Sequence, residues 1–206
     1  MSHTIVLASS NQGKLEEIAA ILVDYPVNLV TQAEFAVGDV EETGLSFVEN
    51  ALIKARHACY QTGQMAMADD SGLEVDALNG APGIYSARYA GEHGNSAANN
   101  NKLLAALEHV PTEQRQARFQ CVIVLLRHAN DPTPLICQGT WEGHISATPS
   151  GTQGFGYDPL FLVKSHGCTA AQLPATIKNQ ISHRALALQQ LTAPVSYTHL
   201  TLPTKA

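Results

Sequence analysis

Two adjacent acids follow an apolar run near the middle of the chain. Residues 65–68 are typical of a short buried strand, which would end at Asp69 and Asp70, ahead of Ser71 and Gly72. Strand side chains alternate between the two faces of a sheet, so the two carboxylates are predicted to point in opposite directions. Ligands of open α/β sheets bind at the carboxyl ends of strands, and carboxylate oxygens suit a hard cation such as magnesium. By itself the stretch is typical of a solvated turn, and a catalytic or metal-binding centre is the alternative that the rest of the chain must support.

Residues 9–14, Ser-Ser-Asn-Gln-Gly-Lys, lie between a β-rich run and a helical pattern. The N–H groups and the positive dipole end of a helix N-terminus form a natural seat for phosphate. Ser9 and Asn11 would add donors there, Gly13 would let the backbone approach closely, and Lys14 would add a positive charge. The G-x-x-x-x-G-K-[ST] pattern of a Walker A loop is absent. A phosphate-binding loop and a merely capped helix start are both compatible with this pattern.

Phe155 stands between Gly154 and Gly156 in a glycine-rich stretch. A core position does not favour a ring isolated between glycines, whereas a ligand platform does, because both ring faces would be open to a flat base. Stacking of a base on such a ring contributes about 1–3 kcal/mol. The alternative is a glycine-rich turn with Phe155 tucked inward.

Two cationic residue types begin the last predicted helix. Ser182 can cap this helix, which places His183 and Arg184 in its first turn, where positive charge opposes the helix dipole. We interpret this placement as favouring an anionic or carbonyl-bearing ligand, with ordinary surface residues as the alternative. Glu41 and Glu42 precede an earlier helix and could extend toward the cleft that Asp70 would face.

Predicted strands and helices, which would position these residues, alternate along much of the chain. Strands are predicted at residues 4–8, 27–30, 65–68, 73–75, 118–127, 135–145 and 161–163, and helices over 15–22, from Ser46, over 99–107 and from Ser182 to about Leu191. Residues 135–145 would form one or two antiparallel strands, with Gly139 and Gly143 as candidate bulges. This order favours one α/β domain over residues 1–191, built on a mixed sheet. Thr192, Ala193 and Pro194 predict the end of the last helix, and residues 192–206 a disordered or artefactual tail.

Composition excludes several classes of protein. The chain has 206 residues, 45% of them hydrophobic and 15% charged, which is typical of a globular fold. A formal net charge of −6 makes non-specific binding of a nucleic-acid backbone unfavourable. Four widely spaced cysteines indicate buried thiols in a reducing compartment rather than zinc ligands or disulfides. No apolar run has the length of a signal peptide or a membrane span, so we expect a cytoplasmic protein that does not bind membranes.

Seven motifs occur in a fixed order along the chain. They are Ser9-x-Asn11-x-x-Lys14, Glu41-Glu42-Thr43-Gly44, Glu49-Asn50-Ala51, the ADDSGL of residues 68–73, the GAPGIYSARY of residues 80–89, the GFGYDP of residues 154–159 and Ile181-Ser182-His183-Arg184. Together they resemble the inosine triphosphate pyrophosphatase family over residues 4 to about 191. The resemblance implies an elongated mixed central β-sheet flanked by helices, with two lobes and the active cleft between them. It also implies a homodimer that hydrolyses ITP, dITP or XTP to the monophosphate and pyrophosphate with Mg²⁺.

The resemblance also implies roles for individual residues. Asp70 would be the general base and a magnesium ligand, and Glu42 the second metal ligand, with Glu41 as its alternative; Lys54 would be a phosphate contact, and Asp69 would support the turn. The implied substrate-binding residues are Ser9, Ser10, Asn11, Gln12, Gly13, Lys14, Ser71, Phe155, Gly156, Tyr157, Asp158, Lys178, His183 and Arg184.

Two other functions remain open at this level. One is a pyrophosphatase for modified pyrimidine or ordinary deoxynucleotides, which Phe155 and the Ser182-His183-Arg184 group disfavour. The other is a nucleotide-binding protein without catalysis. The presence of both Asp70 and Glu42 disfavours it, because binding alone does not need a water-activating acid.

Overall fold

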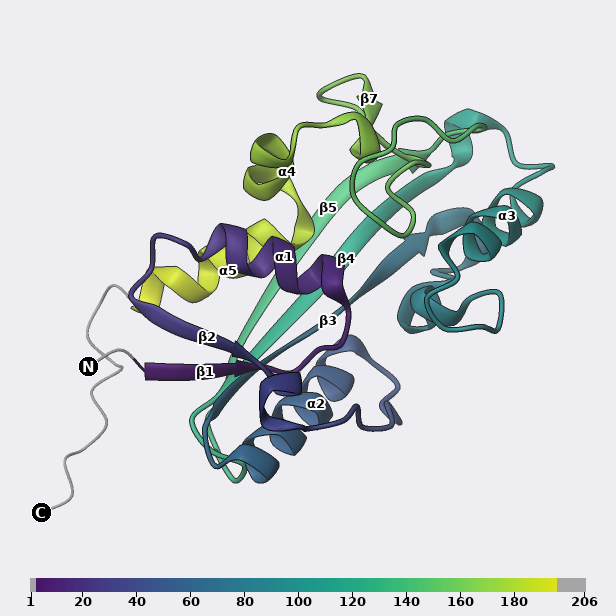
Figure 1. Cartoon of the computed structure of the whole chain (residues 1–206). Helices are drawn as coiled ribbons and strands as arrows, with labels where there is room; N and C mark the ends of the chain where they lie inside the picture. Colours follow the sequence, from purple (N-terminus) through teal and green to yellow (C-terminus); the bar gives the residue numbers. More distant parts are fainter. Residues whose placement is uncertain (1–2, 196–206) are drawn as a thin grey trace, which may run out of the picture.

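One seven-stranded sheet runs through the molecule (Figure 1). The computed structural model describes residues 3–195. Its strands are β1 (His3–Leu7), β2 (Val27–Thr31), β3 (Met65–Val75), β4 (Gln116–Leu126), β5 (Leu135–Ile145), β6 (Phe161–Val163) and β7 (Cys168–Thr169). Their order across the sheet is β2-β1-β3-β4-β5-β6-β7. Strand β1 is parallel to both of its neighbours, and all the other pairs are antiparallel, so the predicted mixed α/β sheet is confirmed.

Helices cover both faces of this sheet. They are α1 (Gln12–Ile21), α2 (Phe47–Thr62), α3 (Ser96–Ala106), α4 (Ala175–Ile181) and α5 (His183–Val195). Short 3₁₀ helices are η1 (Gln32–Phe35), η2 (Asp76–Leu78), η3 (Gly83–Arg88), η4 (Thr112–Gln114) and η5 (Ala170–Gln172). Within residues 3–195 no helix combines the length and the apolar character that a membrane crossing requires.

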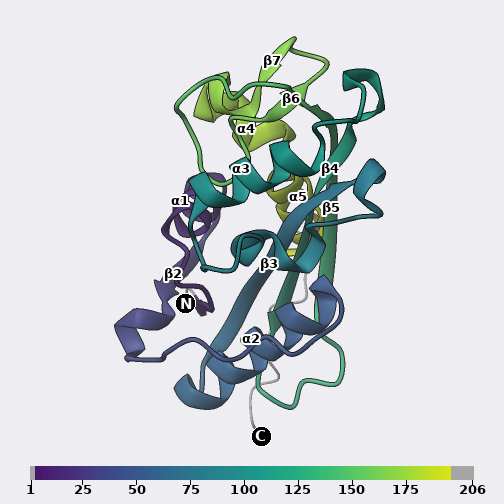
Figure 2. The ribbon, with the colours of Figure 1, turned by 90° about the vertical axis from the view of Figure 1, so that its right-hand side faces the viewer.

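The buried apolar side chains form three clusters. The first fills the face covered by α1 and α5, through residues such as Ile18, Met67 and Leu188. The second, rich in alanine, lies under α2 on the opposite face. The third fills the far end of the long strands, where Leu103 and Phe161 are completely buried. Figure 2 shows α2 and α3 toward opposite ends of β3, which matches the predicted two lobes.

Strand β3 is longer than the sequence predicted. It continues through Asp69 and Asp70 to Val75, so the two short strands predicted at 65–68 and 73–75 are one. The reason is β4, which pairs with β3 without interruption from Ala66 to Val75 and satisfies the backbone on that side. The acids therefore lie inside a strand rather than in a turn.

Strand β1 supports only the first part of β3. Its pairing with β3 is confined to residues 5–7 against 65–67, and the N–H group of Ala8 donates to the Met67 carbonyl oxygen at 2.8 Å. Beyond Met67 the edge of β3 is released from β1, because the chain turns away into the loop before α1. This divergence places the two acids beside an opening at the edge of the sheet.

The predicted caps Ser46 and Ser182 are confirmed, whereas α1 begins at Gln12, before the predicted residue 15, with Asn11 as its cap. The side-chain oxygen of Asn11 accepts from the Lys14 amide at 3.1 Å, and Ser46 accepts from the Glu49 amide. Ser182 Oγ accepts from the Ala185 amide at 3.3 Å. The predicted end of the last helix at residues 192–194 is wrong, because α5 continues to Val195. Proline fixes a helix-compatible φ, and in the final turn it removes only one backbone hydrogen bond. Of the predicted tail, residues 196–206 lie outside the described part of the chain.

Gly139 and Gly143 are not bulges. The register between β4 and β5 is unbroken from Gln116–His144 to Leu125–Leu135. A Cβ atom at Gly139 would lie 2.0 Å from the carbonyl oxygen of His183, and one at Gly143 would lie 2.5 Å from the Phe161 ring. Glycine is needed at these positions because α5 and Phe161 approach the strand closely, which the sequence pattern does not reveal.

All four cysteines are free thiols. Cys59, Cys121 and Cys137 are buried as predicted, whereas Cys168 is partly exposed.

Candidate active site

A cavity of about 780 Å³ lies where β1 diverges from β3. Its walls come from the loop before α1, the middle of β3, the loop before α2, η3, the 155–158 loop and the start of α5. Every predicted site residue lines it: Ser9, Ser10, Asn11, Gln12, Gly13, Lys14, Glu42, Asp70, Ser71, Phe155, Gly156, Tyr157, Asp158, Lys178, His183 and Arg184. The fold therefore brings the whole predicted set together, while the roles of its members stay predictions.

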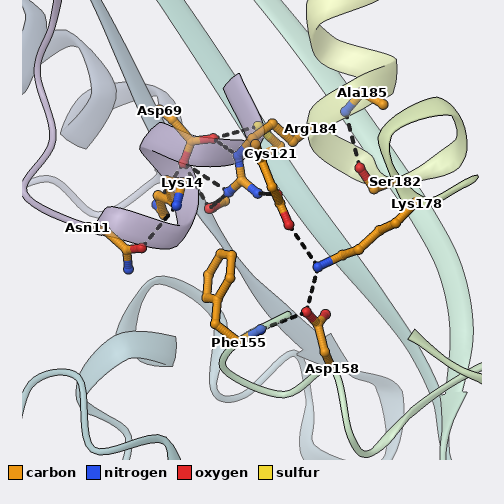
Figure 3. A network of polar contacts seen from close by, with 12 residues as sticks. Asn11, Lys14, Asp69, Cys121, Phe155, Asp158, Lys178, Ser182, Arg184 and Ala185 are labelled. Carbon is orange, nitrogen blue, oxygen red and sulfur yellow. Dashed lines mark hydrogen bonds and ion pairs between the residues drawn. The ribbon is translucent and has the colours of Figure 1, made fainter. Parts of the chain in front are cut away.

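Asp69 is the completely buried member of the acid pair. Its carboxylate binds Lys14 Nζ at 2.6 Å and Arg184 Nε at 2.8 Å (Figure 3), and it also accepts from the Ser71 hydroxyl and the Cys121 thiol. Burial alone would raise the pKa of Asp69, but the charges and hydrogen bonds of Arg184 and Lys14 outweigh burial and lower that pKa well below its ordinary value. The predicted role of Asp69 as a turn support is wrong, because it lies within β3 and anchors two cations.

Asp70 points to the other face of the sheet, toward α2. Its Oδ1 atom binds Lys54 Nζ at 2.7 Å. Its Oδ2 atom is buried and has no hydrogen-bond partner among the described residues. Burial raises the pKa of Asp70, and Lys54 offsets this only in part. A carboxylate with one unpartnered oxygen and a raised pKa can accept a proton from water or bind a cation.

Glu42 shares Lys54 with Asp70. Glu42 Oε1 lies 2.7 Å from Lys54 Nζ, so a single ammonium group joins the two carboxylates. Burial would raise the pKa of Glu42, but Lys54 outweighs it and the pKa is lowered. Glu41 also lines the cavity but forms no ion pair in the described part of the chain.

The two carboxylates fit a magnesium ion. Within residues 3–195 no cluster of three or more His, Cys, Asp or Glu side chains has the arrangement of a complete metal site. Magnesium does not need one, because it keeps several waters and is commonly held by one or two carboxylates together with substrate phosphates. The unpartnered Oδ2 of Asp70 and the half-buried carboxylate of Glu42 are oxygen donors of the required kind.

The loop before α1 is ordered by its own side chains. Ser9 Oγ accepts from the Asn11 amide at 3.2 Å, and Asn11 caps α1. The hydroxyl of Ser10 donates to Asp39 at 2.7 Å, and Asp39 also accepts from Gln32. The first residues of the ten-residue helix α1, Gln12, Gly13 and Lys14, therefore line the cavity in a fixed position.

Phe155 is more enclosed than the glycine pattern suggested. A Cβ atom at Gly13 would lie 2.5 Å from the Phe155 ring, so the loop before α1 packs directly on it. Lys178 Nζ and Arg184 Cζ lie 5.3 Å and 5.9 Å from the ring centroid. The ring is therefore partly covered, where the sequence predicted both faces open. Asp158 accepts from the Phe155 amide and from Lys178, which fixes the loop.

Arg184 is held by carboxylates of the protein itself. Its guanidinium is completely buried and pairs with Asp69 and with Glu17. Glu17 also binds Lys178 Nζ at 2.8 Å. Protein carboxylates therefore account for the cation at the start of α5, where the sequence predicted an anionic or carbonyl-bearing ligand, and the contact of Arg184 with substrate stays a prediction. The sequence reasoning missed Glu17, although its position three residues after Lys14 places both on one face of α1.

His183 is a neutral ring rather than a cation. It is buried and lies nearly parallel to Phe119, with ring centroids 4.7 Å apart and an interplanar angle of 14°. Burial, reinforced by the charge of Arg184, lowers the pKa of His183 well below 6.5. Its Nδ1 atom is buried without a hydrogen-bond partner in the described residues. His183 also lines the cavity, so this unsatisfied nitrogen belongs to a residue of the cavity wall.

The comparisons with known proteins agree with one another. The Ham1 family model matches residues 5–194. A Vibrio cholerae protein named dITP/XTP pyrophosphatase is 58% identical over 187 residues, which is 91% of this chain and 94% of that protein. A Xanthomonas campestris protein of the same name is 61% identical over 191 residues, or 93% of this chain and 96% of that protein.

Solved structures match the fold over nearly the whole chain. The HAM1 protein from Coxiella burnetii is 52% identical, with a TM-score of 0.88 over 96% of this chain and 100% of that one. The Staphylococcus aureus Ham1 protein is 44% identical, with a TM-score of 0.81 over 94% of this chain and 98% of that one. Because the family model matches residues 5–194, which include every residue of the predicted site, this chain belongs to the Ham1 family.

Proposed function

We propose that this protein hydrolyses the non-standard purine nucleoside triphosphates ITP, dITP and XTP to the nucleoside monophosphate and pyrophosphate. Such an activity would keep deaminated purines out of DNA and RNA. The observation that carries the proposal is the unpartnered, buried Oδ2 atom of Asp70 in a cavity that also holds a helix N-terminus and several cations. Relatives that cover more than nine-tenths of the chain carry the corresponding name.

The loop before α1 would bind the phosphates of the substrate. The N–H groups at the start of α1 and the ammonium group of Lys14 would neutralise the triphosphate. Ser9, Asn11 and Gly13 shape this loop so that the backbone can approach the phosphate oxygens. Ser10 acts differently, because its hydroxyl is bonded to Asp39 and holds the loop before α2 in place.

Asp70 would accept the proton of the attacking water at the α-phosphorus. Its raised pKa makes it a better base than an ordinary aspartate. Asp69, one residue earlier, has a lowered pKa and keeps Lys14 and Arg184 in position. The pKa values of the two neighbouring carboxyl groups shift in opposite directions, which fits a chemical role for Asp70 and a structural role for Asp69.

Asp70 and Glu42 would hold Mg²⁺. When bound there, the ion supplies charge neutralisation of the triphosphate and polarisation of the attacking water. Lys54, which joins the same two carboxylates at 2.7 Å, lies close enough to contact the phosphates as well.

Base selection would rest on His183. Hypoxanthine and xanthine carry an oxygen at C6, where adenine carries an amino group. In the tautomer that carries its proton on Nδ1, the neutral His183 ring would donate to this oxygen, whereas it would face another donor if adenine entered. A mismatched pair of buried polar groups is unfavourable, so a large preference for the oxo bases follows. Phe155, with Lys178 and Arg184 beside its ring, would form the remaining wall of the base pocket.

Pyrophosphate release from ITP, dITP, XTP, ATP and GTP, with and without Mg²⁺, tests the proposal. We expect Mg²⁺-dependent turnover of the first three substrates and much lower rates with ATP. Equal rates on ATP and ITP would remove the claim of selectivity, and no turnover of any triphosphate would favour a binding protein. We further propose a cytoplasmic homodimer, which light scattering and cell fractionation would check.

A further inference from the structure

The 3₁₀ helix η3 occupies the edge of β3 that β1 leaves free. Ser86 Oγ accepts from the Leu73 amide at 2.8 Å and donates to the Gly83 carbonyl oxygen at 2.6 Å. A Cβ atom at Gly72 would lie 2.4 Å from that same carbonyl oxygen, so η3 touches the strand backbone directly. This contact fixes η3 as a cavity wall within two residues of Asp70.

Arg88, the last residue of η3, brings a further cation into the cavity. Its guanidinium lies 5.2 Å from the centroid of the half-exposed Tyr85 ring. Its nearest carboxylate atom is Glu42 Oε2, at 3.6 Å. No hydrogen bond of the Arg88 side chain occurs within the described residues, so its donors are available.

The other cavity cations are already committed to carboxylates. The lysine and arginine side chains that share the cavity with Arg88 each have a carboxylate oxygen within 2.8 Å: Lys14, Lys54, Lys178 and Arg184. Arg88 therefore differs from them, because the N–H groups of its planar guanidinium have no hydrogen-bond acceptor among the described residues. A guanidinium can donate two parallel hydrogen bonds to two phosphate oxygens, which an ammonium group cannot.

The position of Arg88 indicates which part of a substrate it would contact. Phe155, Lys178 and Arg184 mark one end of the cavity as the base pocket. Arg88 lies instead beside Glu42, at the end where the metal would bind. A nucleotide whose base lies near Phe155 and whose α-phosphate lies near Asp70 directs its terminal phosphates away from the base pocket.

We infer that Arg88 binds the β- and γ-phosphates of the substrate and the pyrophosphate that leaves. This inference rests on the proposed function. Arg88 is then a substrate-contacting residue whose guanidinium, supported by the Tyr85 ring, stabilises the negative charge that develops on the leaving group.

Product inhibition separates this role from a general structural one. ITP hydrolysis is followed by chromatography of IMP, with added pyrophosphate or added IMP as inhibitor. In Arg88→Ala we expect the inhibition constant for pyrophosphate to rise at least tenfold and kcat/KM for ITP to fall at least tenfold. Inhibition by IMP should change less than twofold. Arg88→Lys keeps the charge without the planar guanidinium and should give an intermediate loss.

Two matched controls belong to the same region. Lys102 is an exposed cation that binds the Tyr89 carbonyl oxygen and lies outside the cavity lining, so Lys102→Ala should match the wild type. Tyr85→Phe keeps the ring under Arg88 and should also match it, whereas Tyr85→Ala should weaken pyrophosphate inhibition. Melting temperatures confirm that each variant is folded.

The outcomes distinguish the inference from the function on which it rests. An unchanged inhibition constant for pyrophosphate in Arg88→Ala, or an equal loss of IMP and pyrophosphate inhibition, would overturn the role of Arg88 while wild-type activity still supports the function. If the wild type hydrolyses no triphosphate, the proposed function fails. Calorimetric binding of magnesium pyrophosphate to wild type and Arg88→Ala then decides the inference by itself, with equal affinities overturning it.

Discussion

Asp69 and Asp70 are consecutive residues of β3, yet their carboxylates bind cations on opposite faces of the sheet. Arg184 of α5 lies 2.8 Å from Asp69 on one face, and Lys54 of α2 lies 2.7 Å from Asp70 on the other. The alternation of strand side chains produces this division. Through these two ion pairs, α5 on one face and α2 on the other are both linked to the part of β3 that borders the cavity.

Replacing Asp70 by asparagine removes the proposed base and keeps the shape of the side chain. We expect kcat for ITP to fall by about a thousandfold, within the range that general bases contribute, while substrate affinity stays nearly unchanged. Steady-state kinetics and equilibrium binding of ITP measure the two quantities. Wild-type turnover in Asp70→Asn would mean that another group is the base.

The same substitution should not destabilise the fold. A carboxyl group with a raised pKa in the folded state binds its proton more tightly there than in the unfolded chain, so its contribution to stability is lost as pH rises through that pKa. At pH 7 the Asp70→Asn protein should therefore unfold in urea with a free energy no lower than that of the wild type. A clear loss of stability would contradict the raised pKa.

Asp69→Asn should have the opposite consequence. It would leave the buried guanidinium of Arg184 with Glu17 as its remaining carboxylate partner, and breaking a buried pair in this way typically lowers stability by about 3–5 kcal/mol. Urea unfolding of Asp69→Asn measures this loss. Asp76→Asn, which removes an exposed pair with Arg118, is the matched control and should lose far less. Equal losses would show that burial does not decide the effect.

His183 should make stability depend on pH. Its pKa in the folded protein is well below the ordinary 6.5, so below pH 6.5 the unfolded chain takes up a proton that the folded chain does not. Stability is then lost as pH falls, by up to about 1.4 kcal/mol per pH unit for one proton. Unfolding free energies of wild type and His183→Phe, measured between pH 7 and 5, should diverge by this slope. Parallel curves would indicate that folding leaves the pKa of His183 unchanged.

Gly139 should be required for the position of α5. In Gly139→Ala the new Cβ atom would meet the His183 carbonyl oxygen at 2.0 Å, so we expect a stability loss at or above the about 1–3 kcal/mol typical of overpacking. Because His183 and Arg184 would move with the helix, KM for ITP should rise. Gly38→Ala, whose Cβ atom has nothing within 4 Å, is the control. A wild-type KM in Gly139→Ala would show that the helix start tolerates the shift.

Local patterns predicted most of the elements, and the family resemblance predicted the members of the cavity. The caps of Ser46 and Ser182 depend on neighbours within a few residues, and the structure has both. The strand that contains Asp69 and Asp70 is longer in the structure than the sequence predicts, because local patterns do not show that β4 pairs with it from Ala66 to Val75.

Ion pairs between residues far apart in the sequence could not be predicted from local patterns. Arg184 is 115 residues from Asp69 and 167 from Glu17, so only the fold shows that its partners are protein carboxylates. The same holds for the neutral state of His183, which results from burial beside Phe119. A residue type at a helix start predicts a charge, but its environment decides the protonation state.

The position of water attack tests the central claim most directly. ITP is hydrolysed by the wild-type protein with Mg²⁺ in water enriched in ¹⁸O, and mass spectrometry follows the label. If Asp70 directs water to the α-phosphorus, the label appears in IMP and none in pyrophosphate. Label in pyrophosphate, or release of orthophosphate from ITP, would contradict the account.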